Sequence, residues 1–322
     1  MHIIIPDDYQ NVIRSLPCFQ LLKDHQVTIY NDTVKDISTM VARFKNADAL
    51  VLTRERTAIT EELVAQLPKL KLISQTGKIS NHLDLAACTR HNIAVTEGIG
   101  SPVAPAELAW LLIMNAVRQV PQATEAMKAG QWQTNIGSTI HGRLIGIWGY
   151  GKIGKRMADY AIAFGAKVMV WGSENSRTQA LQDGLLIAES KAAFFSKADV
   201  VTLHLRLTNS TRSIVTASDL GLMKPNAVLV NSSRAELIEE GALLHALRLG
   251  RPGFAAVDVY ETEPIYDKDY PLLQLPNVIC TPHLGYVEQH SYELYFRKAF
   301  ENVTAFASGT PVNIANPEVL QI

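Results

Sequence analysis

The feature that most constrains this chain is the stretch 144–154, LIGIWGYGKIG, in which a short apolar run ends in the pattern G-x-G-x-x-G. A helical pattern follows and ends near Gly165, and a second apolar run occupies 167–171. The helix is expected to bury one side, made of Met157, Ala158, Ala161, Ile162 and Phe164. Strand, glycine turn, helix and strand in this order are typical of a unit that binds a dinucleotide.

Each glycine of this motif has a physical role. Gly149 permits the tight turn, Gly151 lets backbone N–H groups approach a pyrophosphate, and Gly154 lets the helix pack closely on the strand. The unpaired N–H groups and the positive dipole end of the helix then hold the diphosphate. A glycine turn without any ligand is the alternative, which the flanking periodicity disfavours. The cofactor-binding residues predicted here are Gly149, Tyr150, Gly151, Lys152, Ile153 and Gly154.

Alternating strand and helix patterns extend on both sides of the motif. Apolar runs precede it near 3–5, 27–30, 49–53, 70–74 and 93–95, with helical patterns between them at 9–16, 34–44, 60–66 and 83–91. Further runs follow it at 185–188, 200–205, 227–231, 254–259 and 277–280, with helical patterns at 178–182, 191–195 and 239–249. Such alternation predicts parallel sheets with helices on both faces. We therefore predict an α/β fold with two doubly wound parallel-sheet domains.

Two helical patterns indicate how these domains are connected. The pattern over 287–307 returns the chain to its first domain. We therefore expect a flavodoxin-like domain from 1–100 and 288–322, with a Rossmann-type domain, 101–287, inserted in it. The segment 106–117 is almost wholly apolar, which is typical of a helix buried between layers or at an interface. We interpret it as the crossover between the domains and as part of a homodimer interface.

Composition excludes several classes of function. The net charge of -1 gives no nucleic-acid footprint and no pull toward anionic membranes. The cysteines, Cys18, Cys88 and Cys280, have no metal-binding spacing and indicate a reducing compartment. The first residues lack a basic leader, and no window is long and apolar enough to span a bilayer. We therefore expect a cytoplasmic protein without a metal, a nucleic-acid partner or a membrane partner.

Five sequence blocks in a fixed order carry a resemblance to a known family. They are GYGKIG at 149–154, HLRLTNSTRSIV at 204–215, NSSRAELIEEGALLHAL at 231–247, DVYETEP at 258–264 and TPHLG at 281–285. The chain resembles the D-isomer-specific 2-hydroxyacid dehydrogenases, nearest the phosphoglycerate dehydrogenase-like branch. The resemblance implies an NAD(P)-binding domain inserted in a smaller substrate domain. It also implies hydride transfer between nicotinamide and C2 of a small, anionic D-2-hydroxy or 2-keto acid.

Three charged residues match the chemistry that such a reaction needs. Each follows a predicted strand, at the edge where ligands of parallel sheets bind. Arg234 can grip a carboxylate and polarise the neighbouring carbonyl. His283 can exchange a proton near neutral pH, and Glu263 can orient it and stabilise the imidazolium. A solvated arginine, a packing histidine and a turn acid are the structural alternatives, and the resemblance favours the catalytic roles.

The choice between NAD and NADP stays open at this stage. An acidic residue about 20 residues after the glycine motif holds the ribose 2′-OH of NAD, and Gly172 occupies that position. Ser173, Arg177 and Arg206 suit a 2′-phosphate, whereas Glu174 suits the ribose, so the sequence leans only slightly toward NADP. The resemblance adds a further set of cofactor-binding candidates: Ser173, Glu174, Leu205, Arg206, Thr211, Ser232, Ser233, Asp258 and Gly285.

The substrate-binding candidates lie in the first domain. In the family a loop after the fourth strand offers backbone N–H groups to the substrate carboxylate, and Gly77, Lys78 and Ile79 match it. Ile79 stands where the family has a second glycine, and Lys78 can contact substrate, cofactor phosphate or solvent. Arg54 matches an arginine that binds the substrate phosphate in phosphoglycerate dehydrogenases, but it can equally pair with Glu55 or Glu61. The resemblance therefore does not commit the chain to phosphoglycerate.

Two other functions are compatible with a similar fold. Some relatives act as transcriptional corepressors that sense dinucleotides, and fold alone does not exclude that role. The compact chain without a basic patch favours an enzyme. Formate oxidation is disfavoured because relatives of that type pair the histidine with glutamine, whereas this chain has Glu263.

Overall fold

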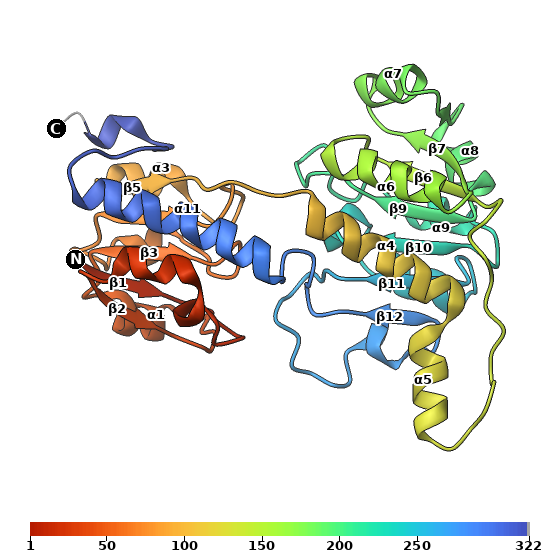
Figure 1. Ribbon diagram of the computed structural model, residues 1–322, viewed down its shortest axis with the longest axis horizontal. Helices are drawn as coiled ribbons and strands as arrows, with labels where there is room; N and C mark the ends of the chain where they lie inside the picture. The colour runs from red at the N-terminus through yellow and green to blue at the C-terminus, as the bar shows by residue number, and fades with distance from the viewer. Residues whose placement is uncertain (321–322) are drawn as a thin grey trace. The chain divides into compact units, whose positions relative to one another are not determined.

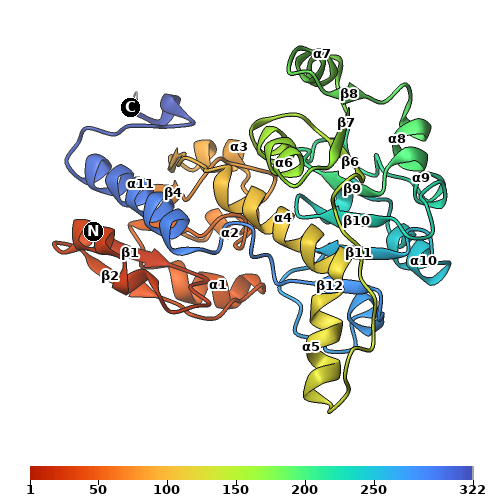
Figure 2. The ribbon, with the colours of Figure 1, turned by 45° about the vertical axis from the view of Figure 1, so that its right-hand side comes forward.

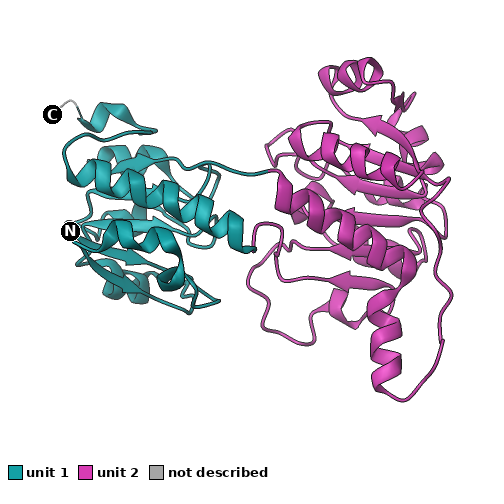
Figure 3. Ribbon diagram, in the orientation of Figure 1, with its two compact units in different colours: residues 1–101, 288–322 teal, residues 102–287 magenta. Residues whose placement is uncertain are grey.

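The computed structural model describes residues 1–320, and the chain divides into two compact units (Figures 1 and 3). Unit 1 combines Met1–Ser101 with Glu288–Ile322, and unit 2 is Pro102–Val287. The first boundary lies one residue beyond the expected position. Ser101 belongs with unit 1 because its N–H donates to the Tyr295 hydroxyl at 3.2 Å.

Unit 1 is built on a parallel sheet whose strand order is β2-β1-β3-β4-β5. This is the flavodoxin-like order expected from the sequence. The strands are β1 (His2–Ile5), β2 (Gln26–Ile29), β3 (Ala49–Leu52), β4 (Leu72–Gln75) and β5 (Ala94–Thr96). The α-helices are α1 (Ile37–Phe44), α2 (Glu61–Val64), α3 (Leu85–Arg90) and α11 (Gln289–Ala307), and 3₁₀ turns occupy η1 (Ile13–Ser15), η2 (Pro17–Leu22) and η5 (Pro317–Leu320).

The helices of unit 1 cover both faces of its sheet. One face packs against α1, α2 and α3 through a core that includes Met40, Phe44, Leu63 and Ala87. The other face carries α11, tied to the sheet by a 2.8 Å hydrogen bond from the Ser74 hydroxyl to the Ala299 carbonyl. The sequence predicted the Thr60 N-cap of α2 correctly, since its side chain accepts from the Leu63 N–H.

The helix predicted near 9–16 is wrong. That segment contains the 3₁₀ turn η1, and a second one, η2, follows it from Pro17. Proline lacks an N–H and fits only the first turn of a helix, and it forces the preceding residue to be extended. Leu16 accordingly has ψ 134°, so no α-helix can continue through this point.

Unit 2 is built on a parallel sheet in the order β12-β11-β10-β9-β6-β7-β8. Its strands are β6 (Leu144–Trp148), β7 (Lys167–Trp171), β8 (Leu186–Ile187), β9 (Val200–Leu203), β10 (Val228–Asn231), β11 (Phe254–Val257) and β12 (Val278–Cys280). Its helices are α4 (Val103–Arg118), α5 (Val120–Lys128), α6 (Lys152–Ala163), α7 (Glu174–Gln182), α8 (Lys191–Lys197), α9 (Ala217–Gly221) and α10 (Ala242–Arg248), with 3₁₀ turns η3 (Ala235–Leu237) and η4 (Pro271–Gln274). The strand order changes direction between β6 and β9, which is where such sheets bind ligands. The predicted α/β class with two parallel-sheet domains is confirmed.

Two apolar layers sandwich the unit 2 sheet. On one face Ile145 and Ile147 of β6 pack with α4 and α6, and on the other Phe194 and Phe195 pack with α9 and α10 (Figure 2). Gly146 is required here, because a Cβ on it would lie 2.8 Å from the Phe194 ring. The sheet that positions the glycine turn is therefore rigidly packed on both sides.

Two expectations about the helices of unit 2 need correction. Ile162 and Phe164, predicted on the buried side of α6, are 53% and 48% exposed, because α6 ends at Ala163. The helix predicted at 106–117 is α4, but it is not buried all round, since Leu111 is 54% exposed. The buried side of α4 carries Trp110 and Ile113. Within residues 1–320, no helix is both long and apolar enough to cross a bilayer.

Candidate active site

The three predicted catalytic residues all follow neighbouring strands of the unit 2 sheet. Arg234 comes after β10, Glu263 after β11 and His283 after β12, and these strands are adjacent. Because the strands are parallel, their carboxyl ends lie at one edge of the sheet. The sheet topology therefore brings all three segments to the same edge.

His283 and Glu263 form a direct hydrogen-bonded pair. The imidazole Nδ1 lies 2.6 Å from Glu263 Oε2, and the side chains are 27% and 32% exposed. The second oxygen of the carboxylate, Oε1, accepts from the Tyr260 N–H at 3.0 Å. The carboxylate is thus held at both oxygens and fixes which face of the imidazole ring is committed. The remaining ring nitrogen, Nε2, is left for another partner.

A buried carboxylate holds the loop that carries His283. Asp258 is 0% exposed and accepts from the Thr281 hydroxyl at 2.6 Å, the Leu284 N–H at 2.7 Å and the Gly285 N–H at 2.9 Å. Burial raises the pKa of Asp258, and these hydrogen bonds and the nearby His283 oppose that rise. The sequence predicted Asp258 and Gly285 as cofactor contacts and missed that they secure the histidine loop.

The backbone of His283 itself is strained. Its φ is +53°, a left-handed value that non-glycine residues rarely adopt. Such strain persists only where surrounding contacts enforce it, and it is concentrated at functional sites. The ring of Tyr286, which is 7% exposed, meets the imidazole edge-to-face at 5.4 Å between centroids. The sequence gave no signal for this contact.

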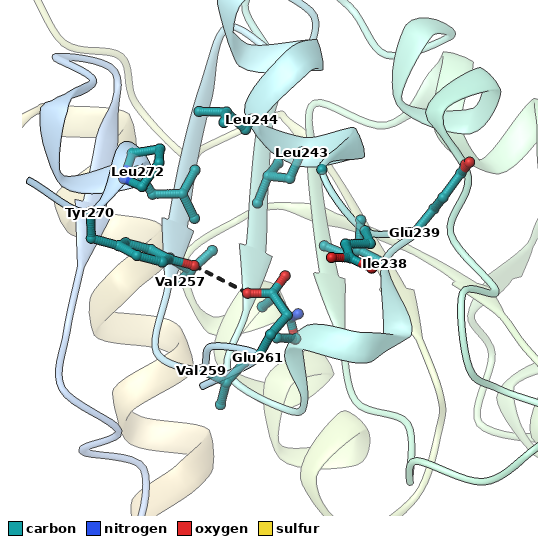
Figure 4. Close-up of a pocket in the computed structure, with 14 residues that line it drawn as sticks. Ile238, Glu239, Leu243, Leu244, Val257, Val259, Glu261, Tyr270 and Leu272 are labelled. Atoms are coloured by element: carbon teal, nitrogen blue, oxygen red, sulfur yellow. Dashed lines mark hydrogen bonds between the residues drawn. The ribbon is translucent and has the colours of Figure 1, made fainter. Parts of the chain in front are cut away.

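The two glutamates of the DVYETEP block have different partners. Glu263 contacts His283, whereas Glu261 accepts a 3.1 Å hydrogen bond from the Tyr270 hydroxyl in an adjoining pocket of unit 2 (Figure 4). That pocket is lined largely by apolar side chains, including Ile238, Leu243 and Leu272. The two carboxylates are therefore distinguishable by mutation.

The Arg234 segment is held by an amide and a hydroxyl. Asn231, 1% exposed, donates from Nδ2 to the Arg234 carbonyl at 2.8 Å and accepts from the Ser233 N–H at 3.1 Å. The Ser233 hydroxyl donates to the Leu203 carbonyl at 2.6 Å. Arg234 contributes a guanidinium bond to the Ser233 carbonyl. Ser233, predicted as a cofactor contact, thus has a structural partner, and Ser232 beside it is half-buried.

The glycine turn after β6 has the shape that a diphosphate needs. A Cβ on Gly149 would lie 2.5 Å from the His204 carbonyl, and one on Gly154 would lie 2.0 Å from the Gly149 carbonyl. Gly151 is the N-cap of α6, and a Cβ there would meet no atom within 4 Å. The first and third glycines are required by packing, while the second faces open space at a helix N-terminus. The residues present therefore fit a dinucleotide diphosphate.

The other predicted residues of this turn divide into backbone and side-chain roles. Lys152 and Ile153 open α6, and Leu205 packs beside Gly149. The Tyr150 hydroxyl donates to Asp183 at 3.0 Å, and burial raises the pKa of this tyrosine. The side chain of Tyr150 is thus committed to packing, and only its backbone can face a cofactor.

The end of β7 carries the candidates for the cofactor ribose. Gly172 has φ +150°, and Arg177 donates to its carbonyl at 3.1 Å while stacking 4.9 Å from the Trp171 ring. Ser173 is the N-cap of α7 and accepts from the Ser176 N–H at 3.3 Å, and Glu174 is the exposed first residue of α7.

Two further candidates lie after β9. Arg206 is exposed, and its carbonyl accepts from the Thr211 hydroxyl at 2.7 Å. This bond holds the turn that follows β9 and occupies the hydroxyl of Thr211, which was predicted to contact the cofactor. Within residues 1–320, no cluster of three or more potential metal ligands is found.

The substrate candidates all lie in unit 1. Arg54 has φ +53°, its N–H donates to the Thr76 hydroxyl at 2.8 Å, and its guanidinium contacts the Thr76 carbonyl at 3.3 Å. A Cβ on Gly77 would collide with this guanidinium, so the glycine makes room for it. Arg54 and Gly77 therefore form one packed unit.

Glu97 occupies the loop predicted to bind a carboxylate. It pairs with Lys78 at 2.6 Å and accepts from the Ile79 N–H at 3.0 Å. The sequence anticipated substrate or solvent beside Lys78 and missed this internal carboxylate. Glu61, considered as a partner for Arg54, pairs instead with Arg90 and His91.

Comparison with known proteins was made against families, curated sequences and solved structures. Residues 110–285 match the family described as D-isomer specific 2-hydroxyacid dehydrogenase, NAD binding domain. A solved phosphoglycerate oxidoreductase from Vibrio cholerae is 56% identical with a TM-score of 0.94, over 96% of this chain and 99% of that one.

Two curated relatives differ in how much of them the chain covers. The D-3-phosphoglycerate dehydrogenase of Methanocaldococcus jannaschii is 36% identical over 76% of this chain but only 47% of its own length. The glyoxylate reductase of Aeropyrum pernix is 32% identical over 88% of this chain and 87% of its own. The chain thus spans about half of the first relative and most of the second.

Proposed function

Because the chain belongs to the D-isomer-specific 2-hydroxyacid dehydrogenase family, in its phosphoglycerate dehydrogenase-like branch, we propose that it interconverts a small D-2-hydroxy acid and its 2-keto acid. The family uses a nicotinamide cofactor, NAD or NADP, which supplies or accepts the hydride at C2. The observation that carries the proposal is the 2.6 Å contact between His283 Nδ1 and Glu263 Oε2.

In this proposal His283 is the acid and base of the reaction. During reduction, Nε2 donates its proton to the carbonyl oxygen as the hydride reaches C2, and the keto acid becomes the hydroxy acid. During oxidation, Nε2 removes the hydroxyl proton while the hydride leaves. Glu263 holds Nδ1 and stabilises the imidazolium that carries the proton.

Arg234 is proposed to bind the substrate carboxylate and polarise its carbonyl. A guanidinium suits both tasks because it offers several donors in a fixed fork. The bonds from Asn231 and Ser233 that fix its backbone support this role. Asp258 is proposed to keep the His283 loop in its strained conformation.

The residues that would hold the dinucleotide are those of the glycine turn. Backbone N–H groups near Gly151 would bind the diphosphate at the start of α6, where the open space fits it. The predicted contacts of Leu205, Arg206, Thr211, Ser232, Ser233, Asp258 and Gly285 remain proposals, and several of these groups have internal partners as described above.

The substrate is proposed to be a small anionic acid whose second anionic group, if present, meets Arg54. Gly77, Lys78 and Ile79 are proposed to meet the carboxylate, in exchange with Glu97. The names of the relatives identify phosphoglycerate and glyoxylate chemistry as the first substrates to test. A cytoplasmic homodimer is part of this proposal, and sedimentation of the protein tests the dimer.

The experiment is a screen of glyoxylate, hydroxypyruvate, pyruvate and phosphohydroxypyruvate with NADH and NADPH, following the absorbance of the reduced nicotinamide. We expect His283→Ala to lower turnover by roughly 10²- to 10⁴-fold while dinucleotide binding is retained. The matched control is His245→Ala, which changes an exposed histidine on α10 of the same unit. Unchanged turnover in the His283 variant would remove the mechanism, and no turnover with any acid would favour a dinucleotide-binding protein.

A further inference from the structure

The end of β7 lies directly beside the glycine turn and offers no carboxylate at the adjoining position. The Gly149 N–H donates to the Trp171 carbonyl at 2.9 Å, and a Cβ on Gly172 would lie 3.6 Å from the Gly149 nitrogen. In NAD-binding sites an acidic side chain near this point accepts from the ribose 2′-OH. Gly172 has no side chain, and its φ of +150° disfavours any other residue.

A cation stands where that acid is missing. The Arg177 guanidinium donates to the Gly172 carbonyl at 3.1 Å and stacks 4.9 Å from the Trp171 ring. These two contacts fix the side chain at the end of β7, and the planar fork has further N–H donors beyond the one already used. Ordering a cation before its ligand arrives lowers the entropic cost of binding an anion.

Two hydroxyls lie next to this cation. Ser173 is exposed, caps α7 and lies 3.2 Å from Ser176, oxygen to oxygen. Glu174 is the acidic residue that follows, and within residues 1–320 no hydrogen bond or ion pair is found that holds its carboxylate. The fixed group at this end of the strand is thus the guanidinium and not the carboxylate.

On the basis of the proposed function, we propose that Arg177 and Ser173 bind the 2′-phosphate of NADP, so that the enzyme selects NADP over NAD. Arg177 supplies the charge-assisted bonds and Ser173 a hydroxyl donor. Gly172 contributes by leaving no carboxylate to repel the phosphate.

The first experiment measures binding without turnover. Adenosine 2′,5′-bisphosphate and 5′-AMP are titrated into the full chain by calorimetry. We expect the bisphosphate to bind at least roughly tenfold more tightly, the effect of one or two charge-assisted bonds. Arg177→Gln should remove most of that difference without changing the affinity for 5′-AMP, and Arg177→Lys should keep part of it. Equal affinities for the two nucleotides in the unmodified protein would overturn the proposal.

The second experiment changes charge at the helix cap while keeping the cap. Aspartate and asparagine both serve as N-caps, so Ser173→Asp and Ser173→Asn preserve α7. Only the aspartate places a negative charge against the 2′-phosphate. We expect Ser173→Asp to weaken bisphosphate binding at least roughly fivefold relative to Ser173→Asn, with 5′-AMP unaffected. An aspartate variant that binds the bisphosphate as tightly as the asparagine variant contradicts the proposal.

Glu174→Gln decides between the two charged residues at this end of the strand. If Arg177 governs selectivity, the variant binds the bisphosphate more tightly than the unmodified protein and binds NAD equally well. If instead the unmodified protein prefers NAD and Glu174→Gln loses that preference, Glu174 holds the ribose and our inference is overturned.

Hydride transfer separates this inference from the proposed function. Reduction of a keto acid with NADH and NADPH at equal efficiency leaves the proposed function standing and rejects the cofactor selectivity. Preferential binding of the bisphosphate without hydride transfer to any keto acid supports the selectivity and rejects the proposed function.

Discussion

At the carboxyl edge of unit 2, the loop that carries His283 is fixed by a buried carboxylate, whereas in unit 1 the loop over 77–79 is held by an accessible one. Asp258 is 0% exposed and accepts three hydrogen bonds around His283. The Glu97 and Lys78 side chains are 28% and 60% exposed. A buried acceptor is costly to leave unpaired, whereas an exposed ion pair exchanges partners readily. We infer that the acid–base group is prebuilt and that the unit 1 loop can trade Glu97 for an incoming anion.

The largest effect that tests this comparison is expected from Asp258→Asn. The amide keeps an oxygen acceptor but turns an NH₂ group toward one of the backbone N–H donors of the loop. The strained backbone of His283 then loses its support, and we expect kcat to fall roughly 10²-fold, the cost of a displaced catalytic group. Steady-state kinetics over a range of pH measures it.

The control for this prediction is Asp219→Asn in the same unit. Asp219 is also buried and accepts from the Thr216 N–H and hydroxyl, both at 2.8 Å, but it caps α9. It should lower stability without a comparable fall in kcat. A similar loss of kcat in both variants would mean that general destabilisation, and not His283 positioning, explains the result.

Glu263→Gln is expected to have the next largest effect. Glutamine still accepts from the His283 ring but lacks the charge that stabilises the imidazolium. The protonated form needed for reduction then persists only at lower pH, so the optimum for keto-acid reduction moves downward and kcat falls roughly tenfold. Glu261→Gln is the matched control, because Glu261 contacts Tyr270 instead. A pH profile that does not move argues against the pairing.

In unit 1, Glu97→Gln is expected to lower KM with little change in kcat. The glutamine can still accept from the Ile79 N–H, but it no longer neutralises Lys78. An anionic substrate then meets an uncompensated cation, and KM should fall roughly three- to fivefold, the scale of an exposed ion pair. The measurement is the KM of the best keto acid at low and high salt.

Two further variants make this result decisive. Lys78→Gln should raise KM, and Glu61→Gln, which removes an exposed pairing with Arg90 and His91 elsewhere in unit 1, should change neither constant. A kcat effect as large as that of Asp258→Asn would show that the unit 1 loop is as tightly coupled to the chemistry as the His283 loop, and the comparison would fail.

How far the sequence predicts the molecule depends on how local each signal is. The glycine turn and the alternating apolar runs are local, so the two sheets and the position of β6 are predictable from them. The helix near 9–16 was predicted incorrectly because its periodicity ignored Pro17. The pattern over 106–117 gave no register, so the exposure of Leu111 was missed.

The candidate site was predictable only where family blocks mark single residues. Arg234, Glu263 and His283 are marked in that way, and their strands are neighbours in the sheet. The contacts of Asp258 with Leu284 and of Glu97 with Ile79 join residues far apart in the chain. No periodicity encodes such pairings, because they arise from how two strand ends meet. The ring of Tyr286 beside His283 depends likewise on the strained backbone.

The smallest effect is expected on stability, from a histidine at the packed edge of unit 2. Burial lowers the pKa of His204 from 6.5 to about 4. The unfolded chain therefore takes up this proton at higher pH than the folded chain does, so the stability that the neutral ring contributes is complete above 6.5 and is lost as pH falls toward 4. Because the residue is partly accessible, we expect a loss on the order of 1 to 2 kcal/mol between about pH 7 and pH 5.

Fluorescence can assign that loss to unit 2, because Trp110, Trp132, Trp148 and Trp171 all lie in it. Denaturant unfolding followed by tryptophan emission should show the loss in the unmodified protein and a smaller one in His204→Gln, whose side chain can still pair with the Thr202 hydroxyl. Asp258 predicts the opposite trend, because its raised pKa means that its protonation accompanies folding as pH falls. If the two variants His204→Gln and Asp258→Asn changed the pH dependence in the same direction, the rigid edge of unit 2 would not be held by the neutral imidazole and the buried carboxylate as we describe.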